Sequence, residues 1–105
     1  MSYKITFSTV AVEDIGKMSN EIYNACLDKK TTEEYVSNLL KKINEKTVFP
    51  ETGIPLLFAK QPTGYRYIIY KSYLAFYRIK GNKIIVERVL FAKSDYFKDL
   101  LIEGD

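Results

Sequence analysis

The sequence predicts an α+β domain in which a helical hairpin covers one face of a mainly antiparallel sheet. Residues 64–92 hold three runs rich in Ile, Val, Tyr and Phe, and only two-residue links separate them. Such runs are typical of a strand meander. Residues 9–46 hold two amphipathic segments joined by a short polar linker, which is typical of an αα-hairpin. Each unit has one apolar side, so each is the natural cover of the other.

The N-terminal half is expected to contain one strand and the two helices. Residues 3–8 alternate between apolar and polar side chains, which indicates a short strand. In residues 9–28 the apolar side chains recur at helical spacing, and Cys26 lies in this stripe, so we interpret Cys26 as a small core residue. Thr31 and Glu34 form a T-x-x-E capping box that is predicted to open the second helix.

The C-terminal half is expected to supply the rest of the sheet. Residues 47–62 contain three prolines and are interpreted as irregular, with a brief extended piece near 56–60 and a turn at 61–64. Three strands follow at 65–71, 73–80 and 83–92, and Gly81-Asn82 marks the second hairpin turn. A short helix after Ser94 completes one domain, residues 1–105, with the order β-α-α-β-β-β-α and a four-stranded sheet.

The amino-acid composition limits the kinds of catalysis, metal binding and partner that this protein can have. The chain has no histidine and one cysteine, which excludes His-based catalysis and His-based or Cys-based metal sites, so we predict no metal and no cofactor. The single cysteine favours a reducing compartment, and no apolar run is long enough to span a membrane, so we expect a cytoplasmic protein. The net charge is −1 over residues 1–59 and +4 over residues 60–105, which favours an acidic or polyanionic partner for the meander.

The order of elements, together with three sequence segments, resembles the RelE/ParE superfamily of bacterial toxins from toxin–antitoxin systems. The segments are FPETGIPL after the helical hairpin, GYRYIIYKSYLAFYRI in the meander and RVLFAKSDYFKDLL at the end. The resemblance implies a toxin that arrests growth and is neutralised by a cognate antitoxin. We expect an acidic or amphipathic antitoxin segment to lie across the helical hairpin and reach the basic meander.

The superfamily divides by target, and the resemblance suggests which residues to test. RelE-like members cut messenger RNA on the translating ribosome with Arg and Lys of the meander and a Tyr or His near the C-terminus. Their reaction needs a proton acceptor, a proton donor and cations at the phosphate. Arg66 and Tyr96 are the catalytic candidates under this alternative. The residues considered for binding a phosphate or a target are Arg66, Arg78, Lys83, Arg88, Lys93 and Tyr96.

Two substitutions favour the ParE-like alternative, a toxin that binds a protein such as DNA gyrase and catalyses nothing. Leu74 occupies the position of an arginine that the RNA-cutting members usually carry, and Phe91 corresponds roughly to their histidine. Arg78 and Arg88 also have a purely structural interpretation, as ion-pair partners of Glu87 and of acidic residues on the helices. A third alternative, a binding module without toxicity, also remains open.

Overall fold

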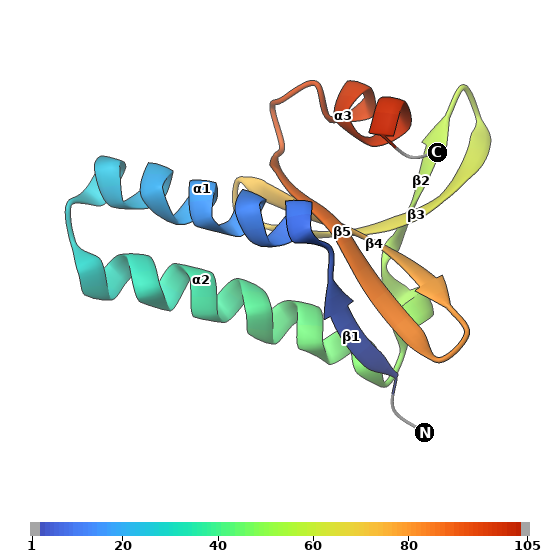
Figure 1. Ribbon diagram of the computed structural model, residues 1–105, viewed down its shortest axis with the longest axis horizontal. Coiled ribbons are helices and arrows are strands. Elements are labelled where there is room, and N and C mark those ends of the chain that lie inside the picture. The colour runs from blue at the N-terminus through green and yellow to red at the C-terminus, as the bar shows by residue number, and fades with distance from the viewer. Residues whose placement is uncertain (1–2, 104–105) are drawn as a thin grey trace.

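The structure, a computed structural model that describes residues 3–103, is a five-stranded mixed sheet with helices on both faces (Figure 1). The sheet order is β1-β5-β4-β3-β2, with β1 parallel to β5 and the other neighbours antiparallel. The predicted α+β fold class is confirmed. The elements are β1 (Lys4–Phe7), α1 (Thr9–Cys26), α2 (Lys29–Asn44), the 3-10 turns η1 (Glu45–Thr47) and η2 (Pro50–Thr52), β2 (Ile54–Phe58), β3 (Gln61–Tyr70), β4 (Tyr73–Lys80), β5 (Lys83–Phe91) and α3 (Tyr96–Glu103).

The sheet is one strand wider than predicted, because β2 pairs with the first half of β3. The expected turn at residues 61–64 is wrong, since the chain reverses at Ala59 and Lys60, which both adopt positive φ angles of 52° and 68°. Two consecutive positive φ values are the geometry of a type I′ hairpin turn. Pro62 is accommodated because β3 pairs with β4 only from Arg66 onward, so no central ladder bond is lost.

The helical hairpin has the expected antiparallel form, with different helix ends. Ser8 caps α1, because its side chain accepts a hydrogen bond from the Ala11 N–H at 2.9 Å. The capping box predicted at Thr31 is wrong, since α2 already begins at Lys29 with Asp28 at its N-cap. Cys26 is exposed and is not the core residue that the helical stripe suggested.

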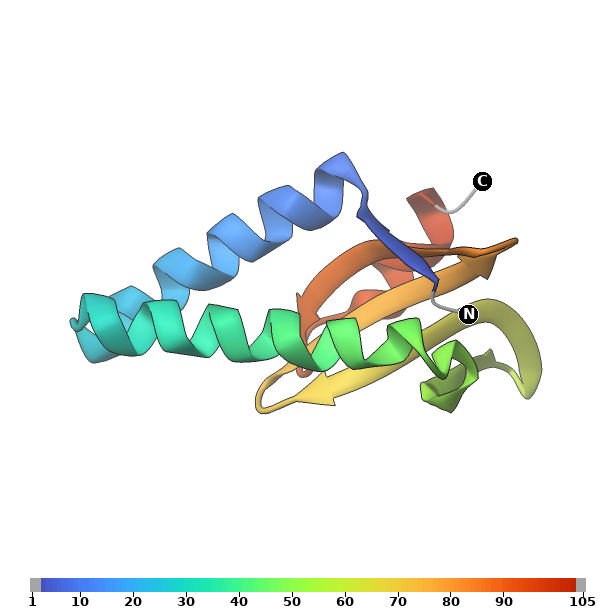
Figure 2. The ribbon, with the colours of Figure 1, turned by 90° about the horizontal axis from the view of Figure 1, so that it is seen from below.

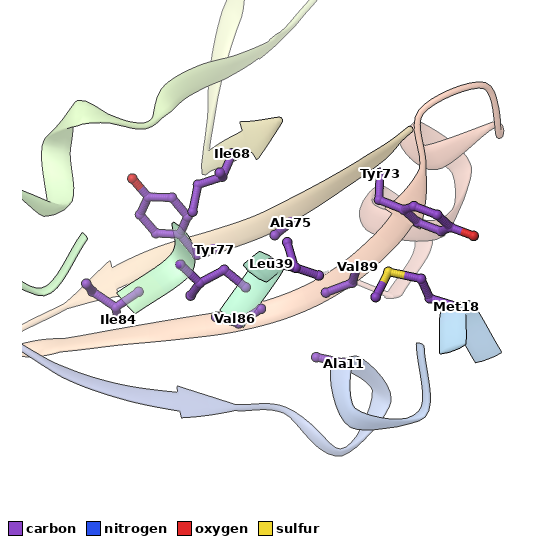
Figure 3. Close-up of a cluster of buried hydrophobic side chains, with 11 residues drawn as sticks. Ala11, Met18, Leu39, Ile68, Tyr73, Ala75, Tyr77, Ile84, Val86 and Val89 are labelled. Atoms are coloured by element: carbon purple, nitrogen blue, oxygen red, sulfur yellow. The ribbon is translucent and has the colours of Figure 1, made fainter. Parts of the chain in front are cut away.

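The main core lies between the hairpin and the sheet (Figure 3). Ala11 and Met18 of α1 and Leu39 of α2 pack against β4 and β5, where Tyr77 and Val89 are buried. Because side chains alternate across a strand, this core assigns the odd residues of β4 and the even residues of β3 to the hairpin face.

A second core occupies the opposite face of the sheet, under α3. Figure 2 shows α3 on the far side of the strands from α2. Its centre is Phe76, which is fully buried as its mid-meander position predicted, and whose ring lies 5.3 Å from that of Tyr96. Leu56, Tyr65, Leu74 and Leu100 complete this cluster. The sheet therefore has a hairpin face and an α3 face, and the candidate residues on β3, β4 and α3 can each be assigned to one of them.

Candidate functional site

Arg66 lies on the hairpin face and binds the protein's own backbone. Its cross-strand neighbour is Tyr77, a residue of the main core. The Arg66 Nη1 donates hydrogen bonds to the carbonyl oxygens of Glu51 and Gly53, each at 3.0 Å. These bonds hold the turn η2 against the sheet. The guanidinium is therefore part of the scaffold that positions β2.

A buried tyrosine fixes the same turn from the inside. The Tyr77 hydroxyl donates to the Pro50 carbonyl and accepts a hydrogen bond from the Gly53 N–H at 3.0 Å. Burial raises the pKa of Tyr77 above its usual value. A Cβ on Gly53 would lie 2.1 Å from this hydroxyl, so only glycine fits here. No local sequence pattern links Tyr77 to Gly53, so this anchor could not be predicted from the sequence.

Arg78 lies on the α3 face and is engaged by two neighbours. Its Nε is 3.5 Å from a carboxylate oxygen of Glu87, and its Nη2 donates to the Tyr65 hydroxyl at 3.1 Å. The guanidinium also lies over the Tyr65 ring, 4.6 Å from the ring centre. The ion pair with Glu87 is the one that the structural interpretation predicted.

Arg88 forms the tightest ion pair described, with Asp14 of α1. The Arg88 Nε and Nη2 donate to the two Asp14 oxygens at 2.8 and 3.1 Å, a two-point contact of fixed geometry. Asp14 also accepts a hydrogen bond from the Val89 N–H at 3.0 Å. Both side chains are largely buried, with 15% and 11% of their surface exposed. The pair ties α1 to the part of β5 that lies beyond β1, which again agrees with the structural interpretation.

Tyr96 begins α3 and packs on the opposite side of the sheet from Arg66. Its ring lies 5.3 Å from that of Phe76 and 5.1 Å from that of Phe97. Leu74, the substituted arginine position, is buried in the same cluster. The structure therefore does not bring Arg66 and Tyr96 together around one phosphate, and apolar side chains surround Tyr96.

The two lysine candidates lie at opposite ends of β5. Lys83 is exposed where β5 begins, and Lys93 is exposed in the turn after β5 ends. Phe91, at the end of the strand, is 42% exposed and its ring contacts Tyr73 at 5.6 Å. The six candidates are thus distributed over both faces and both ends of the sheet, and they do not form a single site.

Two hollows along α1 lie on either side of Tyr73. One of about 320 Å³ is lined by polar residues that include Asp14 and Lys17, and one of about 500 Å³ is more apolar. Both include Glu21, which accepts a hydrogen bond from the Tyr73 hydroxyl at 2.8 Å. Burial, and then this hydrogen bond to Glu21, raise the pKa of Tyr73 well above its usual value. The neutral hydroxyl is therefore a hydrogen-bond donor that links α1 to β4, and not a proton acceptor.

One exposed apolar surface was not among the predicted site residues. On the α3 face, the helix leaves uncovered an apolar strip, which we call the β2–β3 strip, formed by Ile54, Tyr67 and Ile69. Ile54 and Tyr67 are cross-strand neighbours, and Ile69 follows Tyr67 on the same side of β3. Ile54 and Ile69 are 43% and 48% exposed. Alternation along β3 could have indicated this strip, but only the position of α3 shows that it stays uncovered.

The described residues contain no obvious metal site and no membrane span. Within residues 3–103, no three His, Cys, Asp or Glu side chains come close enough together to hold a metal ion. None of the helices in that range combines the length and the apolar character needed to cross a membrane.

The fold occurs in solved structures from bacterial toxin–antitoxin systems. A chain of the chromosomal ParDE system from P. aeruginosa superposes with a TM-score of 0.73 at 14% identity, covering 88% of this chain and 98% of the other. A chain of the RelBE2 toxin–antitoxin complex from Mycobacterium tuberculosis has a TM-score of 0.62 at 19% identity, with 89% and 95% covered. At these identities the likeness establishes the fold. No curated protein sequence matches the chain.

The amino-acid sequence identifies the protein family more specifically than the fold does. Residues 5–96 match the family described as the ParE toxin of the type II toxin–antitoxin system parDE. The protein belongs to this family, and it is a toxin of the RelE/ParE superfamily, as the sequence resemblance predicted.

Proposed function

We propose that this toxin arrests growth in the cytoplasm by binding a protein target, with DNA gyrase as the first candidate, and that a cognate antitoxin neutralises it. The observation that carries the proposal is the state of the three arginines. Arg66 holds a backbone turn, Arg78 pairs with Glu87, and Arg88 pairs with Asp14. A phosphate bound at any of them would have to displace an existing contact.

The chemistry of RNA cleavage supports the same choice. Metal-free cleavage needs cationic donors aimed at the phosphate, and the loss of one such donor typically costs about 3 kcal/mol of transition-state stabilisation. Leu74 offers no donor on the face where Tyr96 lies, and Arg66 is on the other face. The Tyr96 hydroxyl alone cannot supply both proton transfer and charge stabilisation.

The β2–β3 strip is the surface that we assign to the target. Apolar patches that remain exposed beside polar surroundings commonly mark protein-binding sites. Phe58, separated from Ile54 on β2 by the buried Leu56, is also exposed at 51%, and its ring lies 5.4 Å from that of Phe97 in α3. A flat apolar strip next to aromatic rings suits a protein surface better than it suits a charged RNA backbone.

The test is a charge placed in the strip. Ile69→Glu should abolish growth arrest on induction and inhibition of gyrase supercoiling by the purified toxin, because a buried carboxylate at an apolar interface is unfavourable. The side chain is half exposed, so the fold should persist. Val12→Glu is the matched control, since Val12 is 58% exposed on α1, and it should keep both activities.

Each contrary result of these experiments would refute a different part of the proposal. Unchanged toxicity of Ile69→Glu would show that the strip does not contact the target. Toxicity without any effect on gyrase would exclude gyrase and leave another protein target. An absence of growth arrest by the unaltered chain would favour the third alternative, a binding module without toxicity.

A further inference from the structure

Three lysines lie side by side at the end of the sheet where β1 and β5 begin and β4 ends (Figure 1), and we call them the lysine ladder. Lys4 of β1 is the register partner of Lys83 of β5, and Lys83 is the partner of Lys80 of β4. All three side chains are exposed. They project from the α3 face, because the residues that follow two of them, Ile5 and Ile84, pack on the hairpin face into the main core.

The lysine ladder has no counter-charge from the described part of the protein. Strands in a sheet are about 4.8 Å apart, so three ammonium groups in register repel one another. Within residues 3–103, none of the three side chains takes part in an ion pair or a hydrogen bond. The sequence contains no acidic residue from 52 to 86. A bound polyanion would relieve this repulsion.

The lysine ladder differs in this respect from the arginines of the same sheet. Arg66 is held by backbone carbonyl groups, and Arg78 and Arg88 are held by carboxylates. An anion at the lysine ladder displaces no such contact. Lysine also binds phosphate as a point charge on a flexible stem, so it needs no fixed two-point geometry.

The neighbouring row of side chains indicates which polyanion fits. Thr6, Ile85 and Arg78 are in register on the same three strands, two residues away from the three lysines. Thr6 is exposed and offers a hydroxyl, whereas Ile85 is half-buried. Neither row contains an aromatic side chain. Single-stranded nucleic acids typically bind where their bases stack on aromatic rings, so this surface favours the backbone of a duplex.

We propose that the lysine ladder binds the phosphate backbone of duplex DNA. The three lysines span about 10 Å across the strands, and consecutive nucleotides of one DNA strand rise by about 3.4 Å, so the flexible side chains can reach two or three consecutive phosphates. The Thr6 hydroxyl would donate to the same backbone. Contacts of this kind position a protein on DNA without reading its sequence.

The choice of DNA as the duplex rests on the proposed function, whereas the phosphate chemistry of the lysine ladder does not. A toxin bound to gyrase would lie beside the DNA on which gyrase acts. The lysine ladder would then add a contact to DNA to the contact that the β2–β3 strip makes with the protein target.

Other anionic partners fit this surface less well. Membrane binding by a basic cluster typically uses four or more basic residues, or apolar side chains that insert into the lipid, and the lysine ladder has neither. An acidic protein surface would usually bring an apolar centre, and the two rows offer only the half-buried Ile85 to it. A second copy of the chain would place one lysine ladder against another, where they would repel.

The test is an NMR titration of the ¹⁵N-labelled full chain with a DNA duplex of about 20 base pairs and arbitrary sequence. Chemical shifts should change at the Lys4, Lys80 and Lys83 amides. The logarithm of the binding constant should fall with the logarithm of the salt concentration with a slope of about −2.7 if three phosphates are contacted. Lys80→Gln/Lys83→Gln should bind about tenfold more weakly or worse at low salt, and its slope should be shallower by about 2.

Lys29→Gln/Lys30→Gln is the matched control, because it removes the same charge from two exposed lysines at the start of α2. It should keep the shift pattern and the salt slope of the parent. Equal weakening by the two double variants would show attraction by net charge alone and would overturn the proposal. An absence of shifts at the lysine ladder with millimolar duplex would also overturn it.

Three competitors of the same length test the choice of ligand. Single-stranded DNA, polyglutamate and duplex RNA should each bind more weakly than duplex DNA. Tighter binding of single-stranded DNA or of polyglutamate would refute a duplex site. Tighter binding of duplex RNA would refute the choice of DNA.

None of these measurements depends on toxicity. A chain that binds the duplex through the lysine ladder but neither arrests growth nor inhibits gyrase would refute the proposed function alone. A toxin that inhibits gyrase and shows no shifts at the lysine ladder would refute only the DNA contact.

Discussion

Arg88 and Asp14 show how single residues hold the hairpin to the sheet. The Asp14 carboxylate accepts hydrogen bonds from the Arg88 guanidinium and from the Val89 N–H. It therefore neutralises the arginine charge and also pairs a backbone donor of β5. Breaking such a pair costs more than the pair contributes, because the remaining charge is left buried without compensation. For the same reason, Arg88 could not bind a ligand in place of Asp14 without a loss of stability.

Asp14→Ala should lower the free energy of unfolding by about 3–5 kcal/mol, the typical cost of leaving a buried charge unpaired. Urea denaturation followed by circular dichroism measures it. The double variant Asp14→Ala/Arg88→Met should recover most of the loss, because it removes the orphaned charge. Glu33→Ala, which removes an exposed carboxylate from α2, is the control and should stay close to the parent. If Asp14→Ala behaves like that control, the pair is not important for stability.

The buried tyrosines predict how stability depends on pH. The pKa values of Tyr73 and Tyr77 are raised in the folded protein, so the unfolded chain loses these protons first, from about pH 10 upward. Stability should therefore be complete below pH 10 and decline above it. Tyr73→Phe should decline less steeply than the parent between pH 10 and 12 in thermal melts. Parallel curves for the two proteins would show that Tyr73 titrates normally.

At the scale of elements, the sequence predicted the helices and the meander but missed β2. The hairpin and meander follow from periodicity and from Gly81, which has a positive φ of 60°. The β2–β3 turn has Ala59 and Lys60 at positive φ, where sequence rules expect glycine or asparagine. The element is held by tertiary contacts, from Tyr77 and Arg66 to the turn η2, and a local pattern cannot reveal such contacts.

Gly53→Ala tests that explanation of β2. The new methyl would collide with the Tyr77 hydroxyl, so the turn must move and its buried hydrogen bonds weaken. We expect a loss of about 1–3 kcal/mol in the free energy of unfolding. Gly16→Ala is the matched control, because Gly16 lies in α1 with no atom near its added methyl, and it should gain about 1 kcal/mol. Equal effects of the two changes would contradict the close contact at Gly53.

At the scale of the whole molecule, the sequence predicted the family better than the site. The family prediction relied on many weakly specific positions along the whole chain, and the match over residues 5–96 confirms it. The six candidate residues were chosen by residue type, and type does not show which face a side chain occupies. Arg66 and Tyr96 lie on opposite faces because the strand register separates them. The β2–β3 strip depends equally on register.

The central claim is that this toxin acts without cutting RNA, and primer extension on transcripts after induction tests it most directly. We predict growth arrest with no new cleavage sites within translated codons, for the parent and for Arg66→Ala and Tyr96→Phe alike. New cleavage sites that appear with the parent and disappear in Tyr96→Phe or Arg66→Ala would contradict the claim and establish a RelE-like ribonuclease.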